Sequence, residues 1–159
     1  FLLRGARPPS ELHCVVRRHR KMFIRASNYI GPIHPDNVPL QTIQCDAVLM
    51  ALDPTNVNNR LSAPNKLFEA MAAGVPIITC KELLMGQMVE REEIGLTFEW
   101  GKWDRLKAVI MKMMFDDALC NGMGKRARRL AEKKHNWDFC EDRIGSLYKF
   151  VKKNAAIDA

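Results

Sequence analysis

Residues 62–79, SAPNKLFEAMAAGVPIIT, restrict the possible folds more than any other stretch of the chain. Ser62 suits a helix cap, Pro64 suits the first helical turn because its missing N–H costs nothing there, and Gly74 suits a left-handed C-cap. The following residues, VPIIT, predict a short buried strand. Doubly wound sheets usually bind phosphate where a helix begins beside the carboxyl end of a strand. The stretch therefore predicts a fold class and a candidate anion site together.

Length and composition predict one domain spanning residues 1–159. The chain is 47% hydrophobic, enough for one core, and has no run of about 18 apolar residues that would predict a membrane span. Its start, FLLRGARPPS, becomes basic and proline-rich within a few residues, unlike a secretory signal, and Phe1 is not an initiator Met. We therefore expect a domain excised from a longer protein. Five scattered cysteines without metal-binding spacing favour free thiols in a reducing cytoplasm.

The net charge of +7 favours anionic partners such as phosphates, nucleotides, acidic lipid or nucleic acid. Much of it comes from RRHRK at 17–21 and KRARR at 125–129. Both runs have helical patterns, so a solvated helix face is the simplest explanation of each. Neither run alternates with aromatic residues and no nucleic-acid motif accompanies them, so we rank nucleic-acid binding last.

Strand and helix patterns alternate along the chain. Apolar runs predict strands at 1–5, 27–33, 47–52, 75–79 and 95–100, and helical spacing predicts helices at 8–23, 38–46, 64–73, 81–93, 103–117, 123–136 and 137–154. Residues 55–63 are expected to form a polar loop, and breaks are expected at Gly86 and at Asn121-Gly122. The alternation predicts an α/β fold, a Rossmann-like parallel sheet flanked by helices with a helical carboxyl-terminal tail. The GxGxxG and Walker A motifs are absent, which disfavours NAD, FAD and P-loop chemistry.

Three loops should lie at the carboxyl ends of the predicted strands: after residue 5, at 31–34 and at 53–63. The last leads into the helix near Pro64, whose free N–H groups and positive dipole end suit a diphosphate. Lys66 in the first turn is unfavourable to that dipole unless an anion binds; the alternative is a surface pair with Glu69. Glu69 could accept the hydroxyls of a ribose, although a lone helical Glu is more often solvated.

The stretch APNKLFEAMAAGVPII resembles the donor-binding signature of GT-B glycosyltransferases, in particular the large retaining group 1 type, which is family 4-like. NYIGPI resembles the strand and turn beside the nucleotide base, CDAVLMAL the strand before the donor loop, and residues 94–148 the closing helices. The resemblance covers nearly the whole chain as the carboxyl-terminal donor domain. It implies that the amino-terminal acceptor-binding domain, and a basic pair for the diphosphate that normally precedes FLLRG, lie outside this chain.

The resemblance also implies which residues bind the donor. Glu69 would bind the ribose, and the backbone of a glycine turn would contact the base. The residues facing the diphosphate or lining its pocket would be Ser62, Ala63, Pro64, Asn65 and Lys66, and those of the base turn Gly31, Pro32 and Ile33. The family often has an acidic residue, touching the sugar, eight positions before the equivalent of Glu69. This chain has Leu61 there, so that role is unassigned, with Arg60 or Asn59 as substitutes.

By this resemblance, the complete protein would transfer a hexose from a UDP- or GDP-sugar with retention, and this domain alone would bind the donor weakly and be inactive. The nucleotide sugar is a substrate; no cofactor and no metal are expected, because the loops lack acidic pairs for a divalent ion. No catalytic residue can be named, and His34 is more often solvent-facing than chemical. The alternative is a noncatalytic nucleotide-sugar binding module that needs a partner chain.

The remaining expectations concern partners and location. The partners would be the nucleotide sugar and the acceptor domain, with an acidic membrane surface as a further partner at the cytoplasmic face. Apolar residues of the last helix should pack on this domain, and contact with the missing half is the alternative. They are Trp137, Phe139, Leu147, Tyr148 and Phe150.

Overall fold

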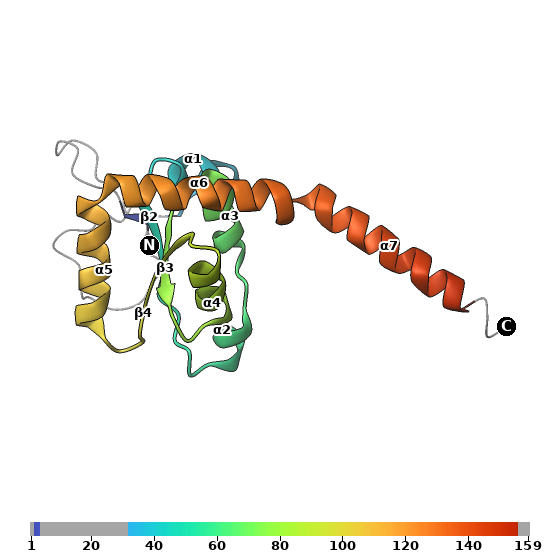
Figure 1. Cartoon of the computed structure of the whole chain (residues 1–159), viewed down its shortest axis with the longest axis horizontal. Coiled ribbons are helices and arrows are strands. Elements are labelled where there is room, and N and C mark those ends of the chain that lie inside the picture. Colours follow the sequence, from blue (N-terminus) through green and yellow to red (C-terminus); the bar gives the residue numbers. More distant parts are fainter. Residues whose placement is uncertain (1, 4–31, 156–159) are drawn as a thin grey trace.

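The computed structural model describes residues 2–3 and 32–155 (Figure 1). In chain order its strands and helices are β1 (Leu2–Leu3), the 3-10 turn η1 (Pro35–Asn37), α1 (Val38–Thr42), β2 (Ala47–Met50), α2 (Val57–Leu61), α3 (Asn65–Ala73), β3 (Ile77–Cys80), α4 (Leu84–Arg91), β4 (Gly95–Phe98), α5 (Trp103–Phe115), α6 (Asp117–Lys134) and α7 (Trp137–Ala155). The helix expected at 8–23 and most of the strand expected at 27–33 lie outside the described residues. Within the described part, no helix is long and apolar enough to span a bilayer.

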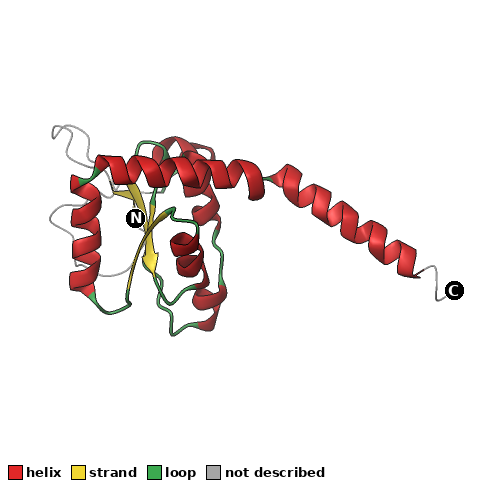
Figure 2. Cartoon of the chain, in the orientation of Figure 1, coloured by secondary structure: helices red, strands yellow, loops and turns green. Residues whose placement is uncertain are grey.

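The described sheet has the order β1-β2-β3-β4, and β2, β3 and β4 are parallel. This confirms the predicted Rossmann-like parallel sheet. Figure 2 shows α5 on one side of these strands and α3 and α4 on the other. The direction of the first strand was wrong: β1 pairs antiparallel with β2 through Leu2–Val48 and Leu3–Ala47. A short apolar run predicts burial and extended backbone, but it carries no information about strand direction.

The two central strands form the middle of the core. Every residue of β2 and of β3 is buried, as expected for parallel strands covered on both faces. Thr79, the polar residue of β3, donates a hydrogen bond from its hydroxyl to the Met50 carbonyl of β2 at 3.0 Å. The buried hydroxyl therefore has an acceptor and adds a cross-strand contact.

Helix α3 passes into β3 through the predicted left-handed cap. Gly74 has φ 68° and ψ 30°, and its N–H bonds to the carbonyls of Ala70 and Met71. Leu67, Ala70 and Met71 are fully buried in the hydrophobic core. The sequence pattern therefore predicted the carboxyl end of α3 and its glycine cap correctly.

Helix α6 crosses this turn at very short range. A Cβ added to Gly124 would lie 2.3 Å from the Gly74 carbonyl oxygen, so only glycine allows the crossing. Arg128, one turn farther along α6, donates to the Ala72 carbonyl and, at 2.6 Å, to the Glu132 carboxylate. Backbone contact and arginine together fix the carboxyl end of α3.

Two predicted helix breaks were wrong, and at one of them, Gly86, the glycine serves a close packing contact. Helix α4 runs through Gly86, where a Cβ would lie 2.1 Å from the Cys80 carbonyl oxygen. Helix α6 runs through Asn121 and Gly122. The chain breaks instead at Asp116, whose carboxylate accepts the Leu119 N–H at 2.8 Å as the N-cap of α6.

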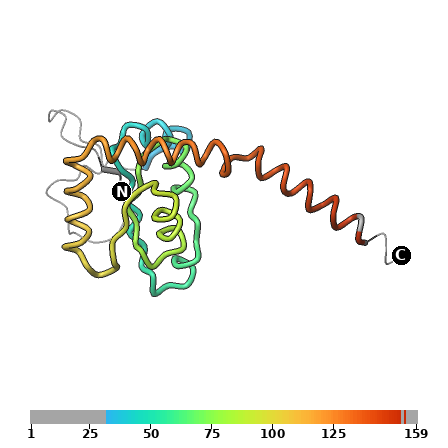
Figure 3. Tube along the Cα trace, in the orientation of Figure 1, coloured from blue at the N-terminus to red at the C-terminus, as the bar shows by residue number. Residues whose placement is uncertain are grey.

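The expectation that the last helix packs on its own domain was also wrong. Helix α7 extends away from the body of the domain (Figure 3), and its described side chains are exposed. Asn136 sets its starting direction by donating to the Glu132 carbonyl at 2.5 Å and accepting the Phe139 N–H at 2.8 Å. The apolar residues expected to be covered are all exposed: Trp137 73%, Phe139 37%, Leu147 60%, Tyr148 66% and Phe150 64%.

The crossing of α6 over Gly74 can be tested with two glycines of the same helix. Gly124→Ala should reduce the free energy of unfolding by about 1–3 kcal/mol, because its methyl group would overlap the Gly74 carbonyl. At Gly122 a Cβ would meet only the flexible end of Arg126 at 3.5 Å. Gly122→Ala should therefore leave stability unchanged or raise it by up to about 1 kcal/mol. Urea unfolding measures both, and equal losses would contradict the close crossing.

Candidate functional site

The chain that leaves β2 is organised by Asp53. Its carboxylate accepts the backbone N–H of Thr55 at 2.9 Å and the Thr55 hydroxyl at 2.7 Å. These hydrogen bonds hold the pKa of Asp53 below its ordinary value. The amide of Asn59 donates to the Asp53 carbonyl at 3.0 Å. The segment that leads to α3 is thus a structured turn.

The predicted polar loop at 55–63 contains the helix α2, so this prediction was wrong over residues 57–61. The signal that could have found it is Asn56, whose side-chain oxygen caps the helix by accepting the Asn58 N–H at 2.9 Å. Ser62 was predicted to cap α3, but its hydroxyl donates to the Asn59 carbonyl at 3.0 Å and closes α2. The chain therefore runs from α2 through three non-helical residues, 62–64, into α3.

The amino end of α3 has no cap of its own. The N-cap position is occupied by Pro64, one residue before the first turn where we expected it, and Pro64 has neither an N–H nor a side-chain acceptor. The Leu67 N–H bonds to the Pro64 carbonyl at 2.9 Å. Within the described part of the chain, the remaining N–H groups around the helix start have no acceptor; they belong to Ser62, Ala63, Asn65 and Lys66.

Charged side chains around these amides are also unpaired. Arg60, Lys66 and Glu69 are exposed, and none forms an ion pair with another described residue. The alternative interpretation of Lys66 as one half of a surface pair with Glu69 is therefore not supported. No acidic residue lies in the first turn of α3. Its positive dipole end and the two cations are left without a counter-charge from the described residues.

The two suggested substitutes for the missing sugar-contacting acid differ in availability. Leu61 is 62% exposed at that position. The Asn59 amide donates to the Asp53 carbonyl, whereas Arg60 is exposed and forms no ion pair with a described residue. Arg60 is thus the freer of the two.

The residues predicted to contact the base lie at the edge of the described chain. Gly31 is outside the described residues, Pro32 is exposed and Ile33 is half-buried just before η1. No hydrogen bond joins Pro32 or Ile33 to the segment 60–69, so their role stays a prediction. His34 lies 3.3 Å from the Asp36 carboxylate, with both side chains exposed.

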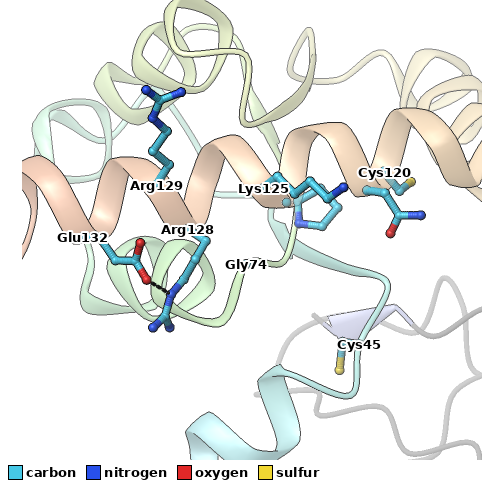
Figure 4. A pocket seen from close by; sticks show the side chains of 10 residues that line it. Cys45, Gly74, Cys120, Lys125, Arg128, Arg129 and Glu132 are labelled. Carbon is cyan, nitrogen blue, oxygen red and sulfur yellow. Dashed lines mark hydrogen bonds and ion pairs between the residues drawn. The ribbon is translucent and has the colours of Figure 1, made fainter.

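One cavity among the described residues lies at the other end of the sheet. It has a volume of about 400 Å³ and lies where β2 and β3 begin, between Cys45, Gly74 and the α6 residues Lys125 and Arg128 (Figure 4). The second, about 370 Å³, lies beside β4 and α5. Neither is lined by Glu69. The candidate site is instead the open surface at the carboxyl end of β2, where the amides and charged side chains without a described partner lie.

Metal-ligating residues are dispersed in this domain. Among the residues that the structure describes, no group of three or more His, Cys, Asp or Glu side chains is close enough to hold an ion. Cys80, at the end of β3, is buried, and burial together with the nearby Glu82 raises its pKa to about 12.

Known proteins are similar to this chain in sequence or in fold. A protein of Bacillus subtilis (strain 168) named "Putative glycosyltransferase YtcC" is 28% identical over 120 residues, which are 75% of this chain and 28% of that protein. The fold matches sucrose-phosphate synthase from Thermosynechococcus elongatus with a TM-score of 0.68 at 21% identity, over 82% of this chain and 31% of that one.

A second fold match is WaaG, described as a glycosyltransferase involved in lipopolysaccharide biosynthesis, with a TM-score of 0.60 at 18% identity. It covers 75% of this chain and 30% of WaaG. The chain thus spans less than a third of the length of each of these proteins.

The sequence profile of one family, described as "Glycosyl transferases group 1", matches residues 40–130, more than half of the chain. The match includes β2, α2 and α3, and so the whole segment with the free amides. The chain therefore belongs to the glycosyl transferases group 1 family, and its fold is one Rossmann-like half of the GT-B architecture.

Proposed function

We propose that this domain holds the donor of a hexosyltransferase, a UDP- or GDP-hexose, on the surface formed by residues 60–69. The observation that carries the proposal is the uncapped start of α3, where four backbone N–H groups find no acceptor among the described residues, in a segment that the family profile matches. Helix starts of this kind bind anions because the free donors and the dipole act together.

The diphosphate would accept hydrogen bonds from these amides, with Arg60 and Lys66 beside it. Both cations are exposed, and neither is paired with a described residue, so binding an anion would break no ion pair within the described part of the chain. The leaving nucleoside diphosphate gains negative charge as the glycosidic bond breaks, and fixed donors at that position stabilise this charge. The proposed transfer therefore requires no metal ion.

Glu69 would bind the ribose. It lies four residues after Asn65, one turn along the same side of α3, and its carboxylate forms no hydrogen bond or ion pair with a described residue. A carboxylate can accept both ribose hydroxyls. One helical turn thus separates the proposed diphosphate contact at Asn65 from the proposed ribose contact at Glu69.

Transfer of the hexose, with retention, would need an amino-terminal acceptor-binding half. Orientation of the acceptor and exclusion of water come from closing a cleft, and the donor surface described here is open. We assign no catalytic residue to this half. The proposal includes a cytoplasmic location, with the exposed Lys125 and Arg129 of α6 facing an acidic membrane surface.

One observation favours a second candidate function, a noncatalytic module that binds a nucleotide sugar. An exposed leucine, Leu61, occupies the position where the resemblance implies an acid in contact with the sugar. Both functions require donor binding. A transfer assay on this domain joined to its acceptor half would separate them, because only the enzyme releases nucleoside diphosphate.

The ribose contact of Glu69 can be tested by comparing UDP and GDP with their 2′-deoxy forms. For the nucleotide that raises the melting temperature of the chain, loss of the 2′-hydroxyl should weaken binding about tenfold, since hydrogen bonds to charged groups are worth about 1.5–3 kcal/mol. In Glu69→Gln this discrimination should become clearly smaller, because a neutral amide oxygen accepts a weaker hydrogen bond, while the unliganded protein keeps its stability to within about 1 kcal/mol. Asp104→Asn, an exposed carboxylate on α5, should discriminate as the parent does. Equal discrimination by parent and Glu69→Gln would contradict the assignment.

Removing a diphosphate contact should change affinity for nucleotides but not for nucleosides. Arg60→Ala and Lys66→Ala should each weaken binding of UDP or GDP several-fold and leave binding of uridine or guanosine unchanged, because the nucleoside lacks the phosphates. Lys107→Ala removes an exposed cation of α5 and provides the matched control. Isothermal titration at two salt concentrations measures these affinities. An equal loss of binding affinity for nucleotide and nucleoside would show that the two side chains do not contact the phosphates.

A further inference from the structure

Strand β4 is the last strand of the described sheet, and it pairs only with β3 among the described strands. The Ile94 carbonyl accepts the Ile77 N–H at 3.2 Å, and the Phe98 carbonyl accepts the N–H of Lys81 at 2.9 Å. In a parallel ladder the backbone groups of alternate residues point to opposite edges of a strand. The N–H and the carbonyl of Thr97 are therefore directed away from β3, to the outer edge of the sheet.

A groove follows this outer edge, and we call it the β4 groove. It is the cavity of about 370 Å³ beside β4 and α5. One wall is a single face of α5, because its lining residues 105, 108, 109 and 112 recur with helical spacing. The other wall includes Glu90 of α4, whose carboxylate accepts the Thr97 hydroxyl at 2.5 Å. Since α4 and α5 lie on opposite sides of the strands (Figure 2), the groove lies between the two helix layers, along β4.

The two walls of the β4 groove carry different charges. The α5 wall contributes two cations, Arg105 and Lys112, and no acid. Lys81, directly after β3, adds a third cation. All three side chains are exposed, and none forms an ion pair with a described residue. The acids of the groove belong to other parts of it: Glu90 to α4, and Glu99 to the end of β4. The α5 wall is thus left without a counter-charge from the described residues.

An extended peptide in which acidic and uncharged residues alternate would match both the edge and the walls. Its backbone would pair with the N–H and carbonyl of Thr97, as an added strand does. Successive side chains of a strand point to opposite faces, so every second residue would face the α5 wall. Arg105 and Lys112 lie two turns apart, about 10 Å along α5, within reach of acids spaced about 7 Å apart on one face. The residues between these acids would face Glu90, which would repel a further acid.

We infer that the β4 groove is a binding site for an extended acidic segment of a partner protein, which joins the sheet as a further strand. The groove includes no residue of the candidate donor surface at 60–69, so the inference does not depend on the proposed function. Charges beside a free strand edge also prevent two sheets from joining. That role alone requires repulsion between two copies of β4 and predicts no affinity for an acidic strand.

Fluorescence anisotropy on the full chain tests the binding, with a fluorescein-labelled peptide of alternating Glu and Thr as the probe. We expect a dissociation constant of about 100 μM at low salt, which increases as salt screens the exposed charges. Arg105→Ala and Lys112→Ala should each weaken binding about two- to fivefold. Lys107→Ala removes an exposed cation of α5 outside the groove and should bind the peptide as the parent does.

Two outcomes of this titration would overturn the inference. Equal losses in all three variants would show attraction by net charge, without a site at the groove. A parent that binds no peptide at about 1 mM would leave the cations only the role of keeping strand edges apart.

Backbone pairing is tested with N-methylated peptides. Methyl groups on alternate backbone nitrogens block one edge of a strand and leave the other edge free. Methylation of every Glu, or of every Thr, gives two peptides of equal charge that are blocked on opposite edges. One of them should bind at least about tenfold more weakly than the unmodified peptide, and the other should keep its affinity. Equal affinities of the two methylated peptides, whether both are kept or both are lost, would contradict strand addition.

The position of the bound peptide is tested by amide hydrogen exchange, followed by NMR. The Thr97 N–H should exchange more slowly with solvent when the Glu-Thr peptide is bound, because it gains an acceptor. The same peptide with Lys in place of Glu should bind more weakly and protect this amide less. Protection at Ser62 and Asn65 instead would place the peptide on the donor surface and overturn the inference.

Discussion

The arrangement of this domain depends on one backbone contact, the crossing of α6 over the turn at Gly74. The left-handed glycine lets the chain reverse from α3 into β3, and Gly124 lets α6 approach its carbonyl without a side chain between them. With Arg128 donating to the Ala72 carbonyl, this contact fixes one end of α3 against the sheet. Because α3 is a rigid helix, its amino end is then held near the carboxyl end of β2.

The two ends of α3 therefore differ in whether their free backbone groups have partners. At the carboxyl end, the glycine cap and Arg128 provide donors for carbonyls that a helix would leave free. At the amino end, Pro64 contributes no cap and the described residues provide no acceptor for the free N–H groups. Protein stability alone would favour a capping side chain there. A helix end left open in this way suits an anionic ligand, and the segment lies within the residues that the family profile matches.

Local sequence signals predicted the centre of the fold. The helix before Gly74, the buried strands at 47–50 and 77–80 and the strand at 95–98 follow from apolar runs and turn residues. Glycine was misread as a helix break at Gly86, where close packing on the Cys80 carbonyl requires it, and at Gly122, which α6 simply accommodates. The short helix α2 was missed because its cap, Asn56, lies in a polar stretch that also suits a loop. The direction of β1 and the exposure of α7 depend on contacts far apart in the sequence, which no local pattern contains. For the candidate site, sequence indicated the segment 60–69, and the structure shows which of its donors and charges have no described partner; the roles of Gly31, Pro32 and Ile33 stay predictions.

The central claim is that a diphosphate binds to the free backbone amides at the start of α3. The most direct measurement is a titration of the isotope-labelled chain with UDP or GDP, followed through the backbone amide resonances by NMR. The account predicts that the largest, saturable shifts belong to Ser62, Ala63, Asn65 and Lys66, and that inorganic pyrophosphate moves the same signals. Shifts concentrated instead at Lys125 and Arg129, beside the cavity at the opposite end of the sheet, would contradict it.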